Sequence, residues 1–223
     1  MGQNILPFYL VCDESGSMDG EPIDAINTAL PELHHEIGIN PVVADKTQFA
    51  IIGFSDRAEV LLPLSNLSQV ASLPVLSTKG STSFGAALRC VKDEIEADVS
   101  RLKSEGHQVY RPVVFFLTDG YPNHGENWRD DHQALTSPSF PYHPNIVAFG
   151  IGEADPTVIS SIATFRAFMS DNSTSPADAL NEFAKALTKS IVRSGSTPAG
   201  DGGMVLQAPD QVPGFTSLSV DAL

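Results

Sequence analysis

Residues 5–17 have the sequence ILPFYLVCDESGS, an apolar run of strand length that ends in an acidic turn containing glycine and serine. An almost continuous apolar run is typical of a central strand that is covered on both faces of a sheet. Three later runs have the same character: residues 48–54 (QFAIIGF), 113–118 (VVFFLT) and 145–151 (NIVAFGI). These segments are therefore expected to form the interior of a parallel sheet.

Amphipathic helical patterns lie between and after these strands. Apolar residues recur every three or four positions over residues 23–37, 84–102 and 180–191, and the last of these patterns follows a capping-box-like start. Two short helices are expected near residues 128–135 and 156–162. Alternating strands and helices predict an α/β fold, namely a doubly wound, mostly parallel sheet with helices on both faces.

The sheet is expected to carry one antiparallel edge strand. Residues 58–63 follow the second apolar run closely enough to pair with it as a hairpin, and residues 165–169 are expected to form an edge strand elsewhere. Residues 1–193 are predicted to form one domain. Residues 194–223 are rich in Gly, Ser and Pro at their start and are predicted to be a C-terminal tail outside that domain.

The composition is acidic, with a formal net charge of -14 from 13 Lys and Arg against 27 Asp and Glu. Such a surface repels the phosphates of nucleic acids and of anionic lipids, so neither is an expected partner. No apolar run approaches the length of a membrane span and no signal peptide is recognisable, which predicts a cytoplasmic protein. Cys12 and Cys90 lie in apolar stretches and are expected to be buried free thiols.

Three oxygen-rich segments are predicted to meet at one edge of the sheet: residues 13–17 (DESGS), 80–82 (GST) and 118–120 (TDG). The first and third directly follow strands, and the second directly precedes a helix. Doubly wound sheets bind ligands at the carboxyl ends of their strands. Each segment alone is more typical of a turn or a helix cap, but their common position indicates a binding site.

Here the chain resembles a known family. The contexts FYLVCDESGSM, KGSTSFGAAL and FFLTDG are similar to the metal-ion-dependent adhesion site of von Willebrand factor A domains. The matching residues are Asp13, Ser15, Ser17, Thr82 and Asp119. The likeness covers roughly residues 4–193. Within the family, DESGSMDGEPIDAIN, EVLLPLSNL, STSFGAALRCV and RPVVFFLTDGYP resemble bacterial tellurium-resistance-associated proteins.

The resemblance implies a divalent metal, Mg²⁺ first, with Mn²⁺ or Ca²⁺ as alternatives. Mg²⁺ prefers oxygen ligands in octahedral geometry. The three hydroxyls would touch the ion, and Asp13 and Asp119 would hold it largely through water. A carboxylate from a partner protein would complete the coordination. A kinase, a phosphatase or another protein of a resistance or stress-signalling complex is the partner that the resemblance suggests.

No general base accompanies this set, so the chain is not expected to be an enzyme. His124 and His132 follow Asp119 in a loop, where histidines are more often exposed than catalytic. Two alternatives stay open. One is a metal-dependent hydrolase or phosphatase, although the second acid expected after an Asp13 nucleophile is replaced by Ser15. The other is a structural interaction domain with a vestigial metal site.

Two further points concern acidic residues. Glu14, inside the motif, would either raise the affinity for metal or disfavour an acidic ligand, and the sequence does not distinguish these effects. Acidic residues of the tail would be able to reach the metal of a neighbouring molecule and imitate the partner. The candidates are Asp201, Asp210 and Asp221.

Overall fold

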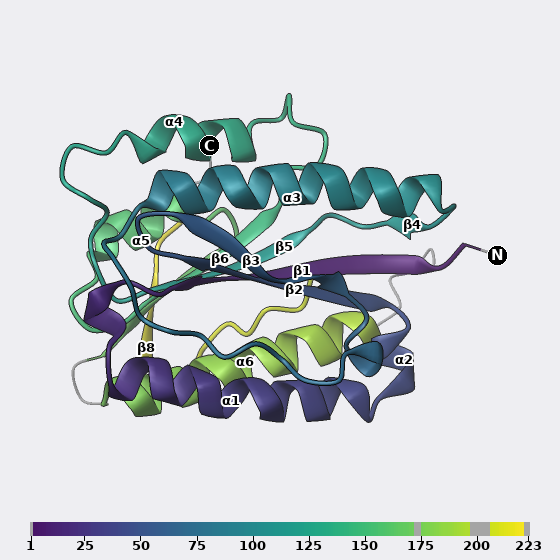
Figure 1. The fold of residues 1–223 in the computed structure, drawn as a ribbon, viewed down its shortest axis with the longest axis horizontal. Coiled ribbons are helices and arrows are strands. Elements are labelled where there is room, and N and C mark those ends of the chain that lie inside the picture. Colours follow the sequence, from purple (N-terminus) through teal and green to yellow (C-terminus); the bar gives the residue numbers. More distant parts are fainter. Residues whose placement is uncertain (1, 172–174, 197–205, 221–223) are drawn as a thin grey trace.

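The computed structural model describes residues 2–171, 175–196 and 206–220. A mixed sheet forms its centre, with helices above and below it (Figure 1). The strands are β1 (Asn4–Asp13), β2 (Thr47–Phe54), β3 (Ala58–Ser65), β4 (Gln108–Val109), β5 (Val113–Thr118), β6 (Asn145–Gly150), β7 (Arg166–Ser170) and β8 (Phe215–Leu218). The helices are α1 (Glu21–Gly38), α2 (Pro41–Ala44), α3 (Phe84–Ser104), α4 (Trp128–Thr136), α5 (Pro156–Ile162) and α6 (Pro176–Ser196), with 3-10 turns η1 (Gly16–Met18) and η2 (Leu67–Gln69).

The side chains of β1 alternate between two hydrophobic cores, one on each face of the sheet. Phe8 and Leu10 belong to the core that includes α1 and α6, whereas Tyr9 and Val11 belong to the core that includes α3. Helices α1, α2 and α6 lie on one side of the sheet in Figure 1, and α3, α4 and α5 lie on the other. The prediction of a doubly wound fold with helices on both faces is therefore confirmed.

The strand order is β3-β2-β1-β5-β6-β7-β8, and β4 pairs with the start of β1. The pairs that join β2, β1, β5, β6 and β7 are all parallel. The strands that follow β1 in sequence, β2 and β3, lie on one side of β1, and the strands from β5 onward lie on its other side. The strand order therefore reverses between β1 and β5, and open sheets of this type bind their ligands at such a reversal.

Both outer strands run antiparallel to their neighbours, one more than the sequence predicts. The β2–β3 hairpin is the expected one. The other is β8, which pairs with β7. β7 was expected to be an edge strand and is instead an inner strand of the sheet. β8 lies in the segment predicted to be outside the domain. The sequence does not predict this strand, because four strand residues flanked by turn residues give little periodicity. Pairing with β7 holds it in place, and the half-buried ring of Phe215 packs edge-on against Phe149 with the ring centroids 5.4 Å apart.

The described part of the C-terminal segment continues the domain beyond the predicted boundary. Helix α6 runs to Ser196, past the domain boundary predicted at residue 193. Leu206 and Val212 are then buried in the same core as α1 and α6. Cys12 is buried and Cys90 half-buried, and both are free thiols. In the described ranges, no helix has the length and apolar character needed to cross a bilayer.

Candidate metal centre

The three oxygen-rich segments meet at the carboxyl end of the sheet, where the strand order reverses. Asp13 is the last residue of β1, and Asp119 directly follows β5, the neighbour of β1 in the sheet. The η1 turn places Ser17 over this point, and the backbone N–H of Gly16 donates to the carbonyl of Gly80 at 3.3 Å. This contact ties the first segment to the loop that carries Thr82.

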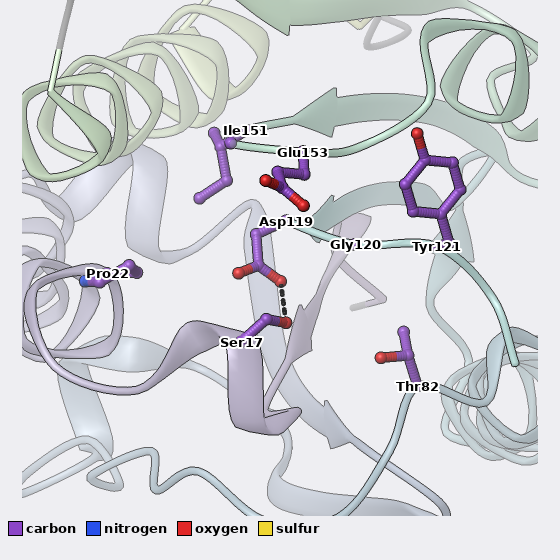
Figure 2. Close-up of a pocket in the computed structure, with 9 residues that line it drawn as sticks. Ser17, Pro22, Thr82, Asp119, Gly120, Tyr121, Ile151 and Glu153 are labelled. Carbon is purple, nitrogen blue, oxygen red and sulfur yellow. Dashed lines mark hydrogen bonds between the residues drawn. The ribbon is translucent and has the colours of Figure 1, made fainter.

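A chain of short polar contacts links the first and third segments. The hydroxyl oxygens of Ser15 and Ser17 lie 3.1 Å apart, and the hydroxyl of Ser17 donates to Oδ1 of Asp119 at 2.7 Å. Figure 2 shows the second of these contacts at the floor of a pocket. Three of the five predicted residues are therefore in direct contact.

Asp13 is fully buried and supports this arrangement from below. Its Oδ1 accepts the backbone N–H of Ser15 at 2.8 Å, and its Oδ2 accepts the hydroxyl of Thr118 at 2.5 Å. Burial raises the pKa of Asp13 to about 6, and the two hydrogen bonds offset part of that rise. Thr118 was within a predicted segment but was not named as a site residue. Its role is to hold and orient the Asp13 carboxylate.

Thr82 approaches the pocket from the other side. Its backbone N–H donates to Oδ1 of Asn123 at 3.1 Å, and the N–H of Asn123 donates back to the Thr82 carbonyl at 2.8 Å. A Cβ atom built on Gly120 would lie 3.7 Å from the hydroxyl oxygen of Ser17 and 3.9 Å from that of Thr82. Both hydroxyls therefore lie beside the same glycine, and the structure brings all five predicted residues to one rim.

A pocket of about 470 Å³ opens above these groups (Figure 2). It is lined by Ser17, Pro22, Thr82, Asp119, Gly120, Tyr121, Ile151, Gly152 and Glu153. Burial raises the pKa of Asp119, the hydrogen bond from Ser17 opposes that rise, and the negative charge of Glu153 adds to it. Glu153 is not among the site residues predicted from the sequence. The rule that ligands bind at carboxyl strand ends would have found it, because it closely follows β6.

Glu14 turns away from the pocket, although it lies between Asp13 and Ser15 in sequence. Its Oε1 accepts the backbone N–H of Ser77 at 2.9 Å, and its Oε2 lies 3.4 Å from the ammonium of Lys79. The backbone of Glu14 also accepts the N–H of Lys79 at 2.6 Å. Glu14 thus stabilises the loop that leads to Thr82 through its contacts with Ser77 and Lys79. It does not line the pocket.

The loop after Asp119 contributes a cap to helix α3. Glu126 accepts the hydroxyl of Ser83 at 2.6 Å and the N–H groups of Phe84 and Gly85 at 3.1 and 2.9 Å, so it caps the start of α3. His132 bonds the carbonyl of Ile162 at 2.9 Å, and burial lowers its pKa. Neither His132 nor the exposed His124 lines the pocket.

The donor set suits a hard divalent cation. In an octahedral Mg²⁺ site with bonds near 2.0–2.1 Å, adjacent ligand oxygens lie about 2.9 Å apart. The 3.1 Å between the hydroxyl oxygens of Ser15 and Ser17, the two proposed ligands in contact, is close to this spacing. Within the described residues, no group of three or more His, Cys, Asp or Glu side chains could hold a metal. An ion at this rim would therefore depend on the hydroxyls, which Mg²⁺, Mn²⁺ and Ca²⁺ accept more readily than softer metals do.

Most of the chain is similar to one known domain family. The model of the von Willebrand factor type A domain matches residues 8–189. A protein of Synechocystis sp. described as uncharacterized is 24% identical over 183 residues, which is 80% of this chain and 40% of that protein. The chain therefore spans less than half the length of this relative.

Two solved structures share the fold. Proximal thread matrix protein 1 from the mussel byssus, solved with a zinc-occupied MIDAS motif, is 21% identical with a TM-score of 0.58, over 86% of this chain and 48% of that one. A von Willebrand factor type A protein from Catenulispora acidiphila is 16% identical with a TM-score of 0.58, over 84% of this chain and 43% of that one.

Proposed function

The chain belongs to the von Willebrand factor type A domain family, whose members generally mediate metal-dependent protein interactions, and from that premise we propose that its rim holds Mg²⁺ and binds a partner protein. The direct ligands would be the hydroxyls of Ser15, Ser17 and Thr82. Asp13 and Asp119 would orient these hydroxyls and contact the ion largely through water. When bound, the metal supplies the positive charge that a partner carboxylate recognises.

The observation that carries this proposal is the contact chain from Ser15 through Ser17 to Asp119 beside an open pocket. Neutral hydroxyl ligands leave most of the charge of a divalent ion uncompensated, so an anionic ligand from outside is favoured. The pocket is open to such a ligand. Ser15, Ser17 and Thr82 would hold the ion, and the pocket above them would admit the partner carboxylate.

We propose a binding function rather than catalysis. Asp13 is fully buried, and both of its oxygens accept hydrogen bonds, from Ser15 and Thr118. A nucleophilic Asp13 would have to give up these bonds and reach a substrate through Ser15. No histidine is among the residues that line the pocket in the described part of the chain. A hydrolase using this rim would therefore lack an accessible Asp13 nucleophile and a histidine base.

The partner would supply a carboxylate. The motif contexts that resemble tellurium-resistance-associated proteins suggest a bacterial resistance or stress-signalling complex, with a kinase, a phosphatase or another protein of that complex as the candidate partner. The aspartates of the C-terminal tail, which would reach the metal of a neighbouring molecule in place of a partner, are weaker candidates. Asp210 pairs with Arg166 at 2.7 Å, and Asp201 and Asp221 lie outside the described residues.

Calorimetric titration with MgCl₂ and with MnCl₂ tests the metal site. The wild-type protein is expected to bind both ions, and Ser17→Ala is expected to lower the affinity at least tenfold. Ser104→Ala is the matched control, because Ser104 is an exposed serine at the far end of α3. Absence of binding by the wild-type protein would favour the vestigial-site alternative, and equal loss in both variants would assign the effect to something other than the site.

A further inference from the structure

The charge around the pocket is unbalanced. Among the nine residues that line it, Asp119 and Glu153 are acidic and none is basic. Asp119 is largely buried and bonded to Ser17, whereas Glu153 is exposed. In the described ranges, the Glu153 carboxylate has no hydrogen bond or ion pair with another side chain. Its charge is therefore available to whatever enters the pocket.

The nearby basic residues lie in a second pocket, on the other side of the Thr82 loop. Arg57 and Lys79 line it together with Gly80. Lys79 lies 3.4 Å from the carboxylates of both Glu14 and Glu59. Asp56 and Glu59 line this second pocket too, so its basic charge is balanced by neighbouring acids, whereas Glu153 has no basic partner among the described residues.

A partner carboxylate that approaches the metal also approaches Glu153. Like charges within a few ångströms repel, and between exposed groups the repulsion is strongest at low ionic strength, where salt screens it least. A basic side chain next to the partner carboxylate would remove this cost and would pair with Glu153. The exposed ring of Tyr121 lines the same pocket. It offers the partner's basic side chain a second favourable contact, a cation–π interaction.

We propose that Glu153 sets the specificity of the site, so that the partner segment carries a lysine or arginine beside its metal-binding acidic residue. This inference rests on the proposed function, because it concerns the ligand of the same metal. The selected partner is a segment of mixed charge, and a uniformly acidic segment is disfavoured at this rim.

Short synthetic peptides with capped ends test the proposal in Mg²⁺ at low ionic strength. Each carries one central aspartate, flanked by lysine, by glutamine or by glutamate, and an asparagine version of each is the blank. Binding is measured by fluorescence anisotropy with the wild-type protein, Glu153→Gln and Glu153→Lys. Glu36→Lys is the matched control, because Glu36 is an exposed acid near the far end of α1 and gives the same change of net charge.

The wild-type protein and Glu36→Lys are expected to bind the lysine-flanked peptide about fivefold more tightly than the glutamate-flanked one. Glu153→Gln should lose most of this preference, and Glu153→Lys should reverse it. Metal-dependent binding of all three aspartate peptides with the same ranking in every variant would overturn the role of Glu153 and leave the metal site standing. Failure of every aspartate peptide to bind more tightly than its asparagine blank would overturn the proposed function, and this inference with it.

Discussion

The β1–η1 loop and the β6–α5 loop each bring a glutamate to the carboxyl end of the sheet, and the two carboxylates have opposite surroundings. Glu14 is fully buried and is held by Ser77 and Lys79. Glu153 is exposed on the wall of the pocket. The residue inside the recognised motif thus supports the loop structure, whereas the residue outside it faces the ligand.

The difference follows from backbone direction. Successive residues at the end of a strand point to opposite sides, so Asp13 and Glu14 cannot both face the pocket. Asp13 is directed toward Thr118 on the neighbouring strand β5, and Glu14 toward Ser77 and the loop that leads to Thr82. Position within a motif is therefore a poor guide to which acid contacts a ligand.

Removal of the two glutamates should separate these roles most clearly. Glu14→Ala is expected to lower the free energy of unfolding by about 2–3 kcal/mol, because it removes a buried hydrogen bond and ion pair and leaves a cavity. Glu153→Ala should change it by less than about 0.5 kcal/mol, as is usual for an exposed side chain. Urea unfolding in metal-free buffer measures both, and equal destabilisation would contradict the contrast.

Thr118→Val should weaken the metal site through Asp13. The substitution keeps the shape of the side chain and removes the hydroxyl that bonds Oδ2, so the affinity for Mg²⁺ is expected to fall about 10- to 100-fold. Thr47→Val is the matched control, because Thr47 is a buried threonine at the start of β2 that bonds only a backbone carbonyl. Calorimetry should show near-normal metal binding for the control.

Acid should release the metal. Protons compete with the cation for Asp13, whose pKa lies at about 6 in the metal-free protein. The affinity for Mg²⁺ is therefore expected to fall about tenfold between pH 7 and pH 5. In the metal-free protein the effect on stability has the opposite sign. Because folding raises the pKa of Asp13, its protonated form stabilises the fold fully below pH 3.8, the ordinary pKa of the group. This stabilisation is lost as the pH rises through about 6.

Glu153→Gln should have the smallest effect on the metal itself. It removes one exposed negative charge near the ion, so the affinity for Mg²⁺ is expected to fall about two- to threefold at low ionic strength, and less as salt is added. Calorimetric titration at two salt concentrations measures this. A loss as large as that in Thr118→Val would make Glu153 a metal ligand rather than a selector of the partner.

Much of the fold follows from the apolar runs. Buried parallel strands are continuously apolar, so β1, β2, β5 and β6 were recognisable, and the long helices showed clear periodicity. The five oxygen-bearing residues were predicted to share one rim because carboxyl strand ends meet there. Their ligand roles toward a metal stay a prediction.

Other features depend on tertiary contacts and left little local signal. β8 is recruited by pairing with β7 and by the contact between Phe215 and Phe149, which lie far apart in the chain. The orientation of Glu14 depends on Ser77 and Lys79, more than sixty residues away. Glu153 belongs to no motif, and its place just after β6 and on the wall of the pocket identifies it.

The recruitment of β8 from a segment that follows all the other strands in sequence has a counterpart in biosynthesis. Until the ribosome has added residues 215–218, the outer edge of β7 lacks the strand that pairs with it. An open edge is a template for strands of neighbouring nascent chains, and such pairing leads to aggregation. The formal charge of -14 opposes these encounters by repulsion until residues 215–218 close the edge.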